Sequence, residues 1–215
     1  MQSKHNKALR NVFARTSVVP VLTIGAVDEG IALVRALVAG GLGIIEITLR
    51  TEAALATIRR VRADLPDVLV GAGTVLTPEH AADALTAGAR FIVSPGMTPR
   101  LMQAAEHWPV PFLPGAATAS EAMALSDLGY SVLKFFPAEP MGGAAALKAL
   151  AAPLPDISFC PTGGIDALNA AAYLALPNVV AVGGSWVAPA KLVVNQDWAG
   201  ITALAEAAAA MRRRD

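Results

Sequence analysis

The chain has 215 residues, enough for a sizeable core, and we expect one domain over 1–215. Its 17 basic and 17 acidic residues balance, which argues against a general attraction to nucleic acid or to an anionic membrane. Hydrophobic residues make up 54% of the chain and charged residues only 16%, which favours parallel strands buried on both faces. No continuous apolar run is long enough to predict a membrane span, and we expect the basic end at 212–214 to be a solvated helix end.

The N-terminal segment and the cysteine content bear on the cellular compartment. Leu9, Val12 and Phe13 recur at helical spacing after a polar start, which predicts a short amphipathic helix and no signal sequence. The single cysteine, Cys160, cannot form an intramolecular disulfide, and we interpret it as a core residue. Both features predict a cytoplasmic location.

Apolar, β-branched runs recur at intervals of about twenty to twenty-five residues and predict eight strands. Segments rich in Ala and Leu separate them and predict crossover helices, for example over 28–39, 52–63, 78–87 and 120–128. Three of these segments end in glycine before the next strand, where a left-handed residue can end a helix. The expected strands begin near Val18, Ile44, Val68, Phe91, Val110, Val132, Ile157 and Val179.

Eight βα units in this length predict an α/β fold, a closed (β/α)8 TIM barrel with the N-terminal helix as a cap. An open doubly wound sheet is the alternative, and it normally carries a glycine-rich nucleotide fingerprint after its first strand. Residues 18–27 carry no such fingerprint, and no Walker-type phosphate loop is present in the sequence. The barrel predicts a functional site where the strands end and the βα loops begin.

Lys134 is a charged residue inside an apolar strand, VLKFFP at 132–137. Strand alternation places it on one face with Val132 and Phe136. If that face lines the barrel, the ammonium loses hydration, which favours the neutral amine that attacks a ketone. The alternative is a lysine that extends to the rim or pairs with a buried acid. The remaining lysines lie in segments expected to be helix or loop: Lys4, Lys7, Lys148 and Lys191.

Three polar residues at neighbouring strand ends could serve Lys134. Glu46 lies between isoleucines, and a buried carboxylate is costly unless it is paired. It is therefore expected to move protons near a Schiff base, or to be only the ion-pair partner of Lys134 or Arg50. Arg50 can hold a carboxylate with two hydrogen bonds, and Thr74 can add a hydroxyl donor. The set suits a 2-keto acid, with a plain surface role for Arg50 as the alternative.

Glycine pairs end the seventh and eighth expected strands, at Gly163-Gly164 and at 183–184. Glycines let backbone N–H groups approach an anion, and Ser185 adds a hydroxyl, so we expect a phosphate site there. Metal chemistry is disfavoured because no metal-binding spacing is present and the histidines fall in expected helices. These are His5, His80 and His107.

Six motifs occur in chain order: EITLRT (46–51), VGAGTV (70–75), SPG (94–96), KFFPAE (134–139), PTGGI (161–165) and GGSW (183–186). Together they resemble the 2-dehydro-3-deoxy-phosphogluconate aldolase and 4-hydroxy-2-oxoglutarate aldolase family, over nearly the whole chain from about residue 18. One departure is Pro140-Met141, where relatives often have Ala-Asn before the paired glycines. We expect that change to affect loop shape more than chemistry.

The resemblance implies a metal-free class I aldolase that needs no cofactor and cleaves 2-keto-3-deoxy-6-phosphogluconate to pyruvate and D-glyceraldehyde 3-phosphate. This step falls late in the Entner–Doudoroff route. The resemblance also implies a homotrimer whose partner is a small phosphorylated 2-keto acid, not a nucleic acid or a membrane. The alternatives are activity on 4-hydroxy-2-oxoglutarate or 2-keto-3-deoxy-6-phosphogalactonate, and a barrel that binds a phosphosugar without turnover.

The resemblance also implies a role for each candidate site residue. Lys134 matches the Schiff-base lysine, and Glu46 matches the general acid and base. The other implied roles are the substrate carboxylate for Arg50 and Thr74, the pocket wall for Pro95 and Phe136, the substrate configuration for Thr162, and the phosphate for Gly163, Gly164 and Ser185.

Overall fold

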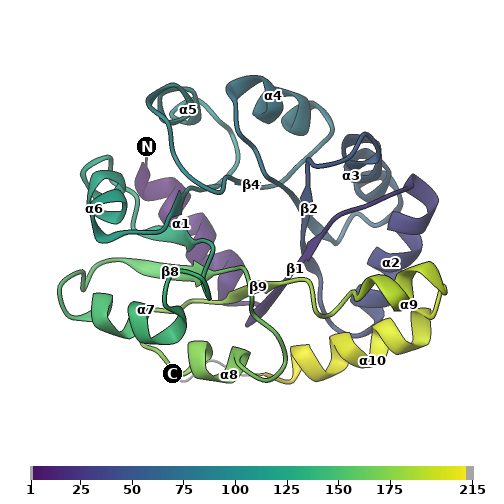
Figure 1. Ribbon diagram of the computed structural model, residues 1–215. Coiled ribbons are helices and arrows are strands. Elements are labelled where there is room, and N and C mark those ends of the chain that lie inside the picture. Colours follow the sequence, from purple (N-terminus) through teal and green to yellow (C-terminus); the bar gives the residue numbers. More distant parts are fainter. Residues whose placement is uncertain (1, 212–215) are drawn as a thin grey trace.

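The computed structural model describes residues 2–211, so the basic end at 212–214 lies outside the described residues. Helices surround the strands of an α/β fold (Figure 1). The strands are β1 (Val18–Leu22), β2 (Ile44–Thr48), β3 (Leu69–Gly73), β4 (Ile92–Val93), β5 (Phe112–Leu113), β6 (Gly115–Ala116), β7 (Val132–Phe135), β8 (Ser158–Pro161) and β9 (Val182–Gly184). The helices are α1 (Gln2–Phe13), α2 (Val27–Ala39), α3 (Ala53–Asp64), α4 (Pro78–Thr86), α5 (Pro99–Ala105), α6 (Ala119–Asp127), α7 (Gly143–Ala151), α8 (Ala170–Leu174), α9 (Ala190–Val194) and α10 (Trp198–Ala209).

The strands are parallel and form a six-stranded sheet and a three-stranded sheet, the larger one a half-barrel. The order is β5-β4-β3-β2-β1-β9 in the first and β6-β7-β8 in the second. Isolated parallel bridges join Phe159 to Val179 and Thr162 to Gly183, which places β8 beside β9. All strands therefore run the same way, and their carboxyl ends share one side of the molecule.

The expected strands and helices are present with small shifts of their ends. The largest shift of a strand is at the eighth, where β9 begins at Val182 rather than at Val179. The fifth expected strand is divided into β5 and β6, because Pro114 between them has no N–H to donate to a ladder. Its carbonyl still accepts a hydrogen bond from the Lys134 N–H at 2.8 Å, so the chain stays beside β7.

The glycines expected to end helices take left-handed conformations, with φ of 95° at Gly88 and 83° at Gly129. Threonine caps begin the helices that follow several strands. Thr118 accepts a hydrogen bond from the Glu121 N–H, and the Glu121 side chain accepts one from the Thr118 N–H, which is a complete capping box at α6. The threonine caps fix where the loops before α4, α5 and α6 pass into their helices.

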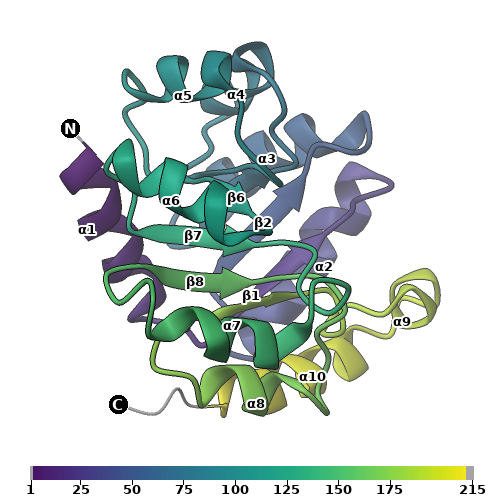
Figure 2. The ribbon, with the colours of Figure 1, turned by 60° about the vertical axis from the view of Figure 1, so that its left-hand side comes forward.

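Apolar side chains fill the inside of the strand layer at its amino end. We call this group the inner cluster; its members are Leu9, Phe13, Val19, Ile44, Phe91, Val93, Leu113, Val132, Cys160, Val180 and Ala181. Leu9 and Phe13 come from α1, and Figure 2 shows α1 at the amino ends of β7 and β8. The expected N-terminal helix is thus present and packs as a cap, and the expected core position of Cys160 is confirmed.

Polar contacts tie α1 to the loops before β7 and β8. The Asn6 side chain donates to the Gly129 carbonyl at 2.8 Å and accepts from the Ser131 N–H at 3.0 Å. Arg10 donates to the Ser158 hydroxyl at 3.2 Å. Across residues 2–211, no helix is both long enough and apolar enough to span a membrane.

Candidate active site

Lys134 lies in β7 with its side chain buried beside Glu46 of β2. Lys134 Nζ is 3.0 Å from Glu46 Oε1 and 3.4 Å from Oε2, and the two residues are 5% and 4% exposed. Val132, on the same face, belongs to the inner cluster, whereas Leu133 and Phe135 pack outward among the helices. The predicted alternation along this strand is therefore confirmed.

The ion pair is the arrangement expected both of a proton-transfer pair and of a purely structural pair. The residues around the pair distinguish a proton-transfer role from a purely structural one. Gly73, at the end of β3, leaves the space that the Glu46 carboxylate fills, since a Cβ there would overlap it. The Lys134 ammonium lies 5.5 Å from the centre of the Phe136 ring, and Phe136 lines an open cavity. The pair is thus buried at the edge of an opening that a ligand can enter, which favours a functional role over a purely structural one.

Arg50 and Thr74 stand together after β2 and β3. Arg50 Nε donates to Thr74 Oγ1 at 3.2 Å. Thr74 has a φ of 57°, a left-handed conformation that is costly for a β-branched residue and that surrounding structure must hold. Its hydroxyl is therefore fixed beside an exposed guanidinium, as a carboxylate-binding pair requires.

A cavity of about 200 Å³ opens at the carboxyl ends of the strands. It brings together Arg50, Phe136 and Ser185, which lie far apart in the sequence. Glu46, Thr74, Pro95 and Lys134 are not among its lining residues. The full lining is Val21, Thr23, Arg50, Phe136, Thr162, Gly163, Gly164, Ile165, Gly184 and Ser185.

The residues outside the lining are linked to it by contacts. The Lys134 ammonium lies over the ring of Phe136, which lines the cavity. Thr74 accepts a hydrogen bond from Arg50, which also lines it. Pro95 adjoins Gly115, which is the register partner of Lys134, because a Cβ on Gly115 would overlap the Pro95 carbonyl. The ten predicted residues therefore form one connected region.

Gly184 belongs to the glycine pair predicted at the eighth strand end, and three lining residues were not predicted: Val21, Thr23 and Ile165. Thr23 is a polar residue directly after β1, which is the kind of position at which site residues were predicted on the other strands. Thr23 Oγ1 lies 3.0 Å from Thr48 Oγ1, and Thr48 donates to the Leu22 carbonyl. Val21 and Ile165 carry no polar group, so no sequence signal singles them out.

The predicted phosphate residues lie together at the rim of this cavity. Gly163 and Gly164 have φ values of 103° and 77°, a conformation in which successive N–H groups can face an anion. A Cβ on Gly183 would overlap the Thr162 hydroxyl, so Thr162 is packed closely against β9. Ser185 is exposed at the end of β9. The geometry fits a terminal phosphate at this edge.

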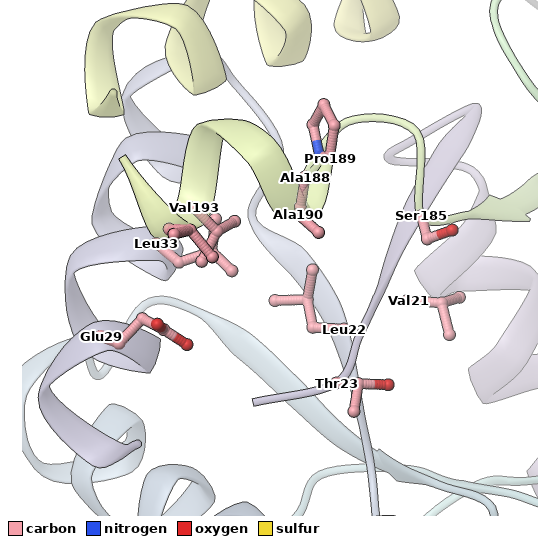
Figure 3. A pocket seen from close by; sticks show the side chains of 11 residues that line it. Val21, Leu22, Thr23, Glu29, Leu33, Ser185, Ala188, Pro189, Ala190 and Val193 are labelled. Atoms are coloured by element: carbon pink, nitrogen blue, oxygen red, sulfur yellow. The ribbon is translucent and has the colours of Figure 1, made fainter. Parts of the chain in front are cut away.

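A second cavity of about 390 Å³ adjoins the first and shares Val21, Thr23 and Ser185 with it. Figure 3 shows Glu29 on α2 across this cavity from Ser185, with apolar side chains between them. Although it is larger, its lining includes neither Arg50, nor Phe136 beside Lys134, nor the glycine turn. We assign the functional site to the smaller cavity because the convergent polar groups lie there.

Other titratable groups are placed away from the cavity. Burial raises the pKa of the Cys160 thiol to about 12; this residue belongs to the inner cluster and is the register partner of Lys134, but it does not line the cavity. His5 and His80 lie in α1 and α4 as expected, whereas His107 lies in a turn directly after α5 and not in a helix. Within the described part of the chain, no group of three or more His, Cys, Asp or Glu side chains could hold a metal ion.

Comparison with known proteins shows similarity over most of the chain. The family model for KDPG and KHG aldolase matches residues 9–204. The 2-dehydro-3-deoxy-phosphogluconate aldolase of Pseudoalteromonas atlantica is 48% identical over 94% of both chains, and the KHG/KDPG aldolase of Escherichia coli is 46% identical over 89% of this chain and 90% of its own. The KDPG aldolase of Legionella pneumophila, solved with pyruvate captured as a covalent carbinolamine, has a TM-score of 0.91 at 43% identity and covers 94% of this chain and 98% of its own.

Proposed function

The chain belongs to the KDPG and KHG aldolase family, and we propose that it is a class I aldolase that cleaves 2-keto-3-deoxy-6-phosphogluconate (KDPG) to pyruvate and D-glyceraldehyde 3-phosphate. One observation carries the proposal. Lys134 Nζ lies 3.0 Å from Glu46 Oε1 in a buried position at the edge of the cavity. The amine and its proton acceptor are already in place for Schiff-base chemistry.

The reaction starts with proton transfer from the Lys134 ammonium to Glu46, which leaves a neutral amine. The amine attacks C2 of the keto acid. Glu46 then delivers two protons in turn to the former carbonyl oxygen, the one it holds and one that it takes from the attacking nitrogen, so that the oxygen leaves as water. The product is a protonated imine, an electron sink beside the bond to be cleaved. Burial of the pair excludes competing water from this step.

Cleavage breaks the bond between C3 and C4, and its electrons move into the imine to give an enamine. Glu46 accepts the proton of the C4 hydroxyl as the aldehyde forms and departs. The same carboxyl group then protonates C3 of the enamine, and water hydrolyses the pyruvate imine to free Lys134. One carboxylate serves every proton transfer because it lies within hydrogen-bonding distance of the lysine.

The two ends of the substrate are charged, and the cavity offers a partner for each. We assign Arg50 and Thr74 to the carboxylate, which a guanidinium and a hydroxyl bind by charge-assisted hydrogen bonds. We assign Gly163, Gly164 and Ser185, which line the same cavity as Arg50, to the phosphate. Holding both charged ends positions C2 of the substrate over the lysine.

Two further residues shape the space between the charged ends. Phe136 forms a wall beside the Lys134 ammonium, and Pro95 adjoins the strand residue paired with that lysine. Thr162 lies between the glycine turn and β9, and we assign it to the choice of the gluconate-configured substrate. Its hydroxyl can bond a substrate hydroxyl of one configuration only.

We also infer a closed (β/α)8 barrel. β5 and β6 are successive pieces of one segment on either side of Pro114, β9 pairs with β1, and bridges link the β8 segment to β9. Family membership further favours a homotrimer in the cytoplasm. Light scattering of the purified protein would test the trimer.

The proposed substrate is tested by comparing kcat/KM for three substrates: KDPG, its galactonate isomer and 4-hydroxy-2-oxoglutarate. The gluconate-configured phosphate is expected to give the highest value. A higher value for either of the others would change the substrate assignment. Absence of pyruvate release from all three would favour a barrel that binds a phosphosugar without turnover.

A further inference from the structure

Glu139 places a carboxylate next to the glycine turn that is assigned to the phosphate. It follows the lysine strand, and its N–H donates to the Gly163 carbonyl at 3.0 Å. A Cβ on Gly164 would lie 2.6 Å from Glu139 Cβ and 2.7 Å from Cγ, so the side chain starts against the turn. A carboxylate directed into the cavity here would repel a phosphate group.

The Glu139 carboxylate is held by contacts with α8 and with the start of α7. The Tyr173 hydroxyl donates a hydrogen bond to Glu139 Oε1, and Tyr173 is 1% exposed in α8. The same oxygen lies near the first residue of α7, since a Cβ on Gly143 would be 3.1 Å from it. A helix N-terminus favours a negative charge. Glu139 is accordingly not among the residues that line the cavity.

We propose that Tyr173 is a positioning residue for phosphate recognition: its hydroxyl keeps the Glu139 carboxylate out of the cavity beside the Gly163-Gly164 turn, leaving the turn free for the phosphate. The inference rests on the proposed function, because it needs that turn to bind a phosphate. Burial and the hydrogen bond to Glu139 raise the pKa of the Tyr173 hydroxyl, so it remains a proton donor.

The turn itself has a separate support. Asn169 Nδ2 donates to the Gly164 carbonyl at 3.0 Å, and the Asp166 side chain accepts from the Asn169 N–H at 3.1 Å. Loss of the Tyr173 hydroxyl therefore leaves these backbone restraints in place. Its expected effect is electrostatic, acting through the freed carboxylate of Glu139.

The test compares KDPG with its counterpart that lacks the phosphate, 2-keto-3-deoxygluconate, by the ratio of their kcat/KM values. Tyr173→Phe frees the carboxylate, and we expect it to lower this ratio about fivefold, mainly through KM for KDPG. Glu139→Gln removes the charge but keeps an acceptor for the tyrosine, so the ratio is expected to stay the same or rise. In the double variant the loss should disappear.

Tyr130→Phe is the matched control, because Tyr130 is 2% exposed and its buried hydroxyl has no hydrogen-bond partner among residues 2–211. It is expected to leave the ratio unchanged. Equal losses in Tyr173→Phe and in the double variant would mean a merely structural role and overturn the inference. If Tyr173→Phe does not fold, a lowered ratio in Glu139→Gln alone would overturn it.

Ser185→Ala distinguishes this inference from the proposed function. If Ser185→Ala lowers the ratio and Tyr173→Phe does not, the phosphate site stands and the role of Tyr173 is wrong. If neither variant changes the ratio, the phosphate assignment itself is wrong.

Discussion

Inward-facing residues have different roles at the amino end and at the carboxyl end of the strand layer. Val132 of β7 packs in the inner cluster with Phe13, and Lys134, two residues further along the same face, meets Glu46. β2 repeats the pattern, with Ile44 in the inner cluster and Glu46 beyond it. On each of these strands, one inward-facing residue packs in the inner cluster and the next one supplies a charged group at the site. The amino end can therefore stabilise the fold without contributing a group to the chemistry.

Among changes at the carboxyl end of the strand layer, removal of the Lys134 amine should have the largest effect on activity. Lys134→Met keeps an unbranched side chain but cannot form a Schiff base, so kcat is expected to fall by about four orders of magnitude or more. Pyruvate release from KDPG measures it. Lys191→Met, on an exposed position of α9, is the control and should keep full activity. A Lys134→Met variant within tenfold of the parent would refute the Schiff-base assignment.

Removal of the proton acceptor should have the next largest effect. Glu46→Gln preserves the size of the side chain and loses the proton transfers, so kcat should fall about 10² to 10⁴-fold. The adduct of Lys134 with pyruvate should still form, but more slowly. Glu206→Gln, exposed on α10, serves as the control. Unchanged turnover in Glu46→Gln would leave that residue as an ion-pair partner only.

Substitutions at the amino end of the strand layer should lower the stability of the fold and leave the rate of the reaction unchanged. Phe13 is 4% exposed in the inner cluster, and Phe13→Ala is expected to lower the free energy of unfolding by about 3 to 5 kcal/mol. Urea unfolding measures this loss, and Lys7→Ala on the exposed side of α1 should show almost none. The kcat/KM of folded Phe13→Ala should stay close to the parent value. A fall in kcat/KM with unchanged stability would contradict the division between the two ends.

Cys160 should make a smaller contribution to the free energy of unfolding, and this contribution depends on pH. Burial raises its pKa to about 12 from an ordinary value of 9.0, so the folded chain keeps a proton that the unfolded chain loses above pH 9. Stability must therefore fall as pH rises from 9 towards 12. The difference in unfolding free energy between the parent and Cys160→Ala should decrease by about 1.4 kcal/mol from pH 8 to pH 10. A constant difference would show that the thiol ionises equally in both states.

Much of this arrangement follows from residue types that interrupt a pattern. Lys134 and Glu46 are charges within apolar runs, and parallel strands bring their carboxyl ends together, so their proximity was predictable. The glycine pairs that end β8 and β9 were likewise predicted at neighbouring strand ends, and the two strand ends do lie side by side. The cap formed by α1 followed from the helical spacing of Leu9 and Phe13.

Other features depend on loop geometry that a local pattern does not encode. The division of the fifth strand at Pro114 needed the register of its neighbours, and the left-handed Thr74 is a conformation that its residue type disfavours. The hydrogen bond from Tyr173 to Glu139 joins a helix to a loop 34 positions away. Such contacts are decided by tertiary packing, which overrides the local signal.

The covalent role of Lys134 is tested most directly by trapping the imine. The protein is incubated with pyruvate, reduced with borohydride and digested, and the modified peptide is mapped by mass spectrometry. The expected result is one pyruvate-derived adduct on Lys134, absent from Lys134→Met. An adduct on another lysine, or none at all, would contradict the account.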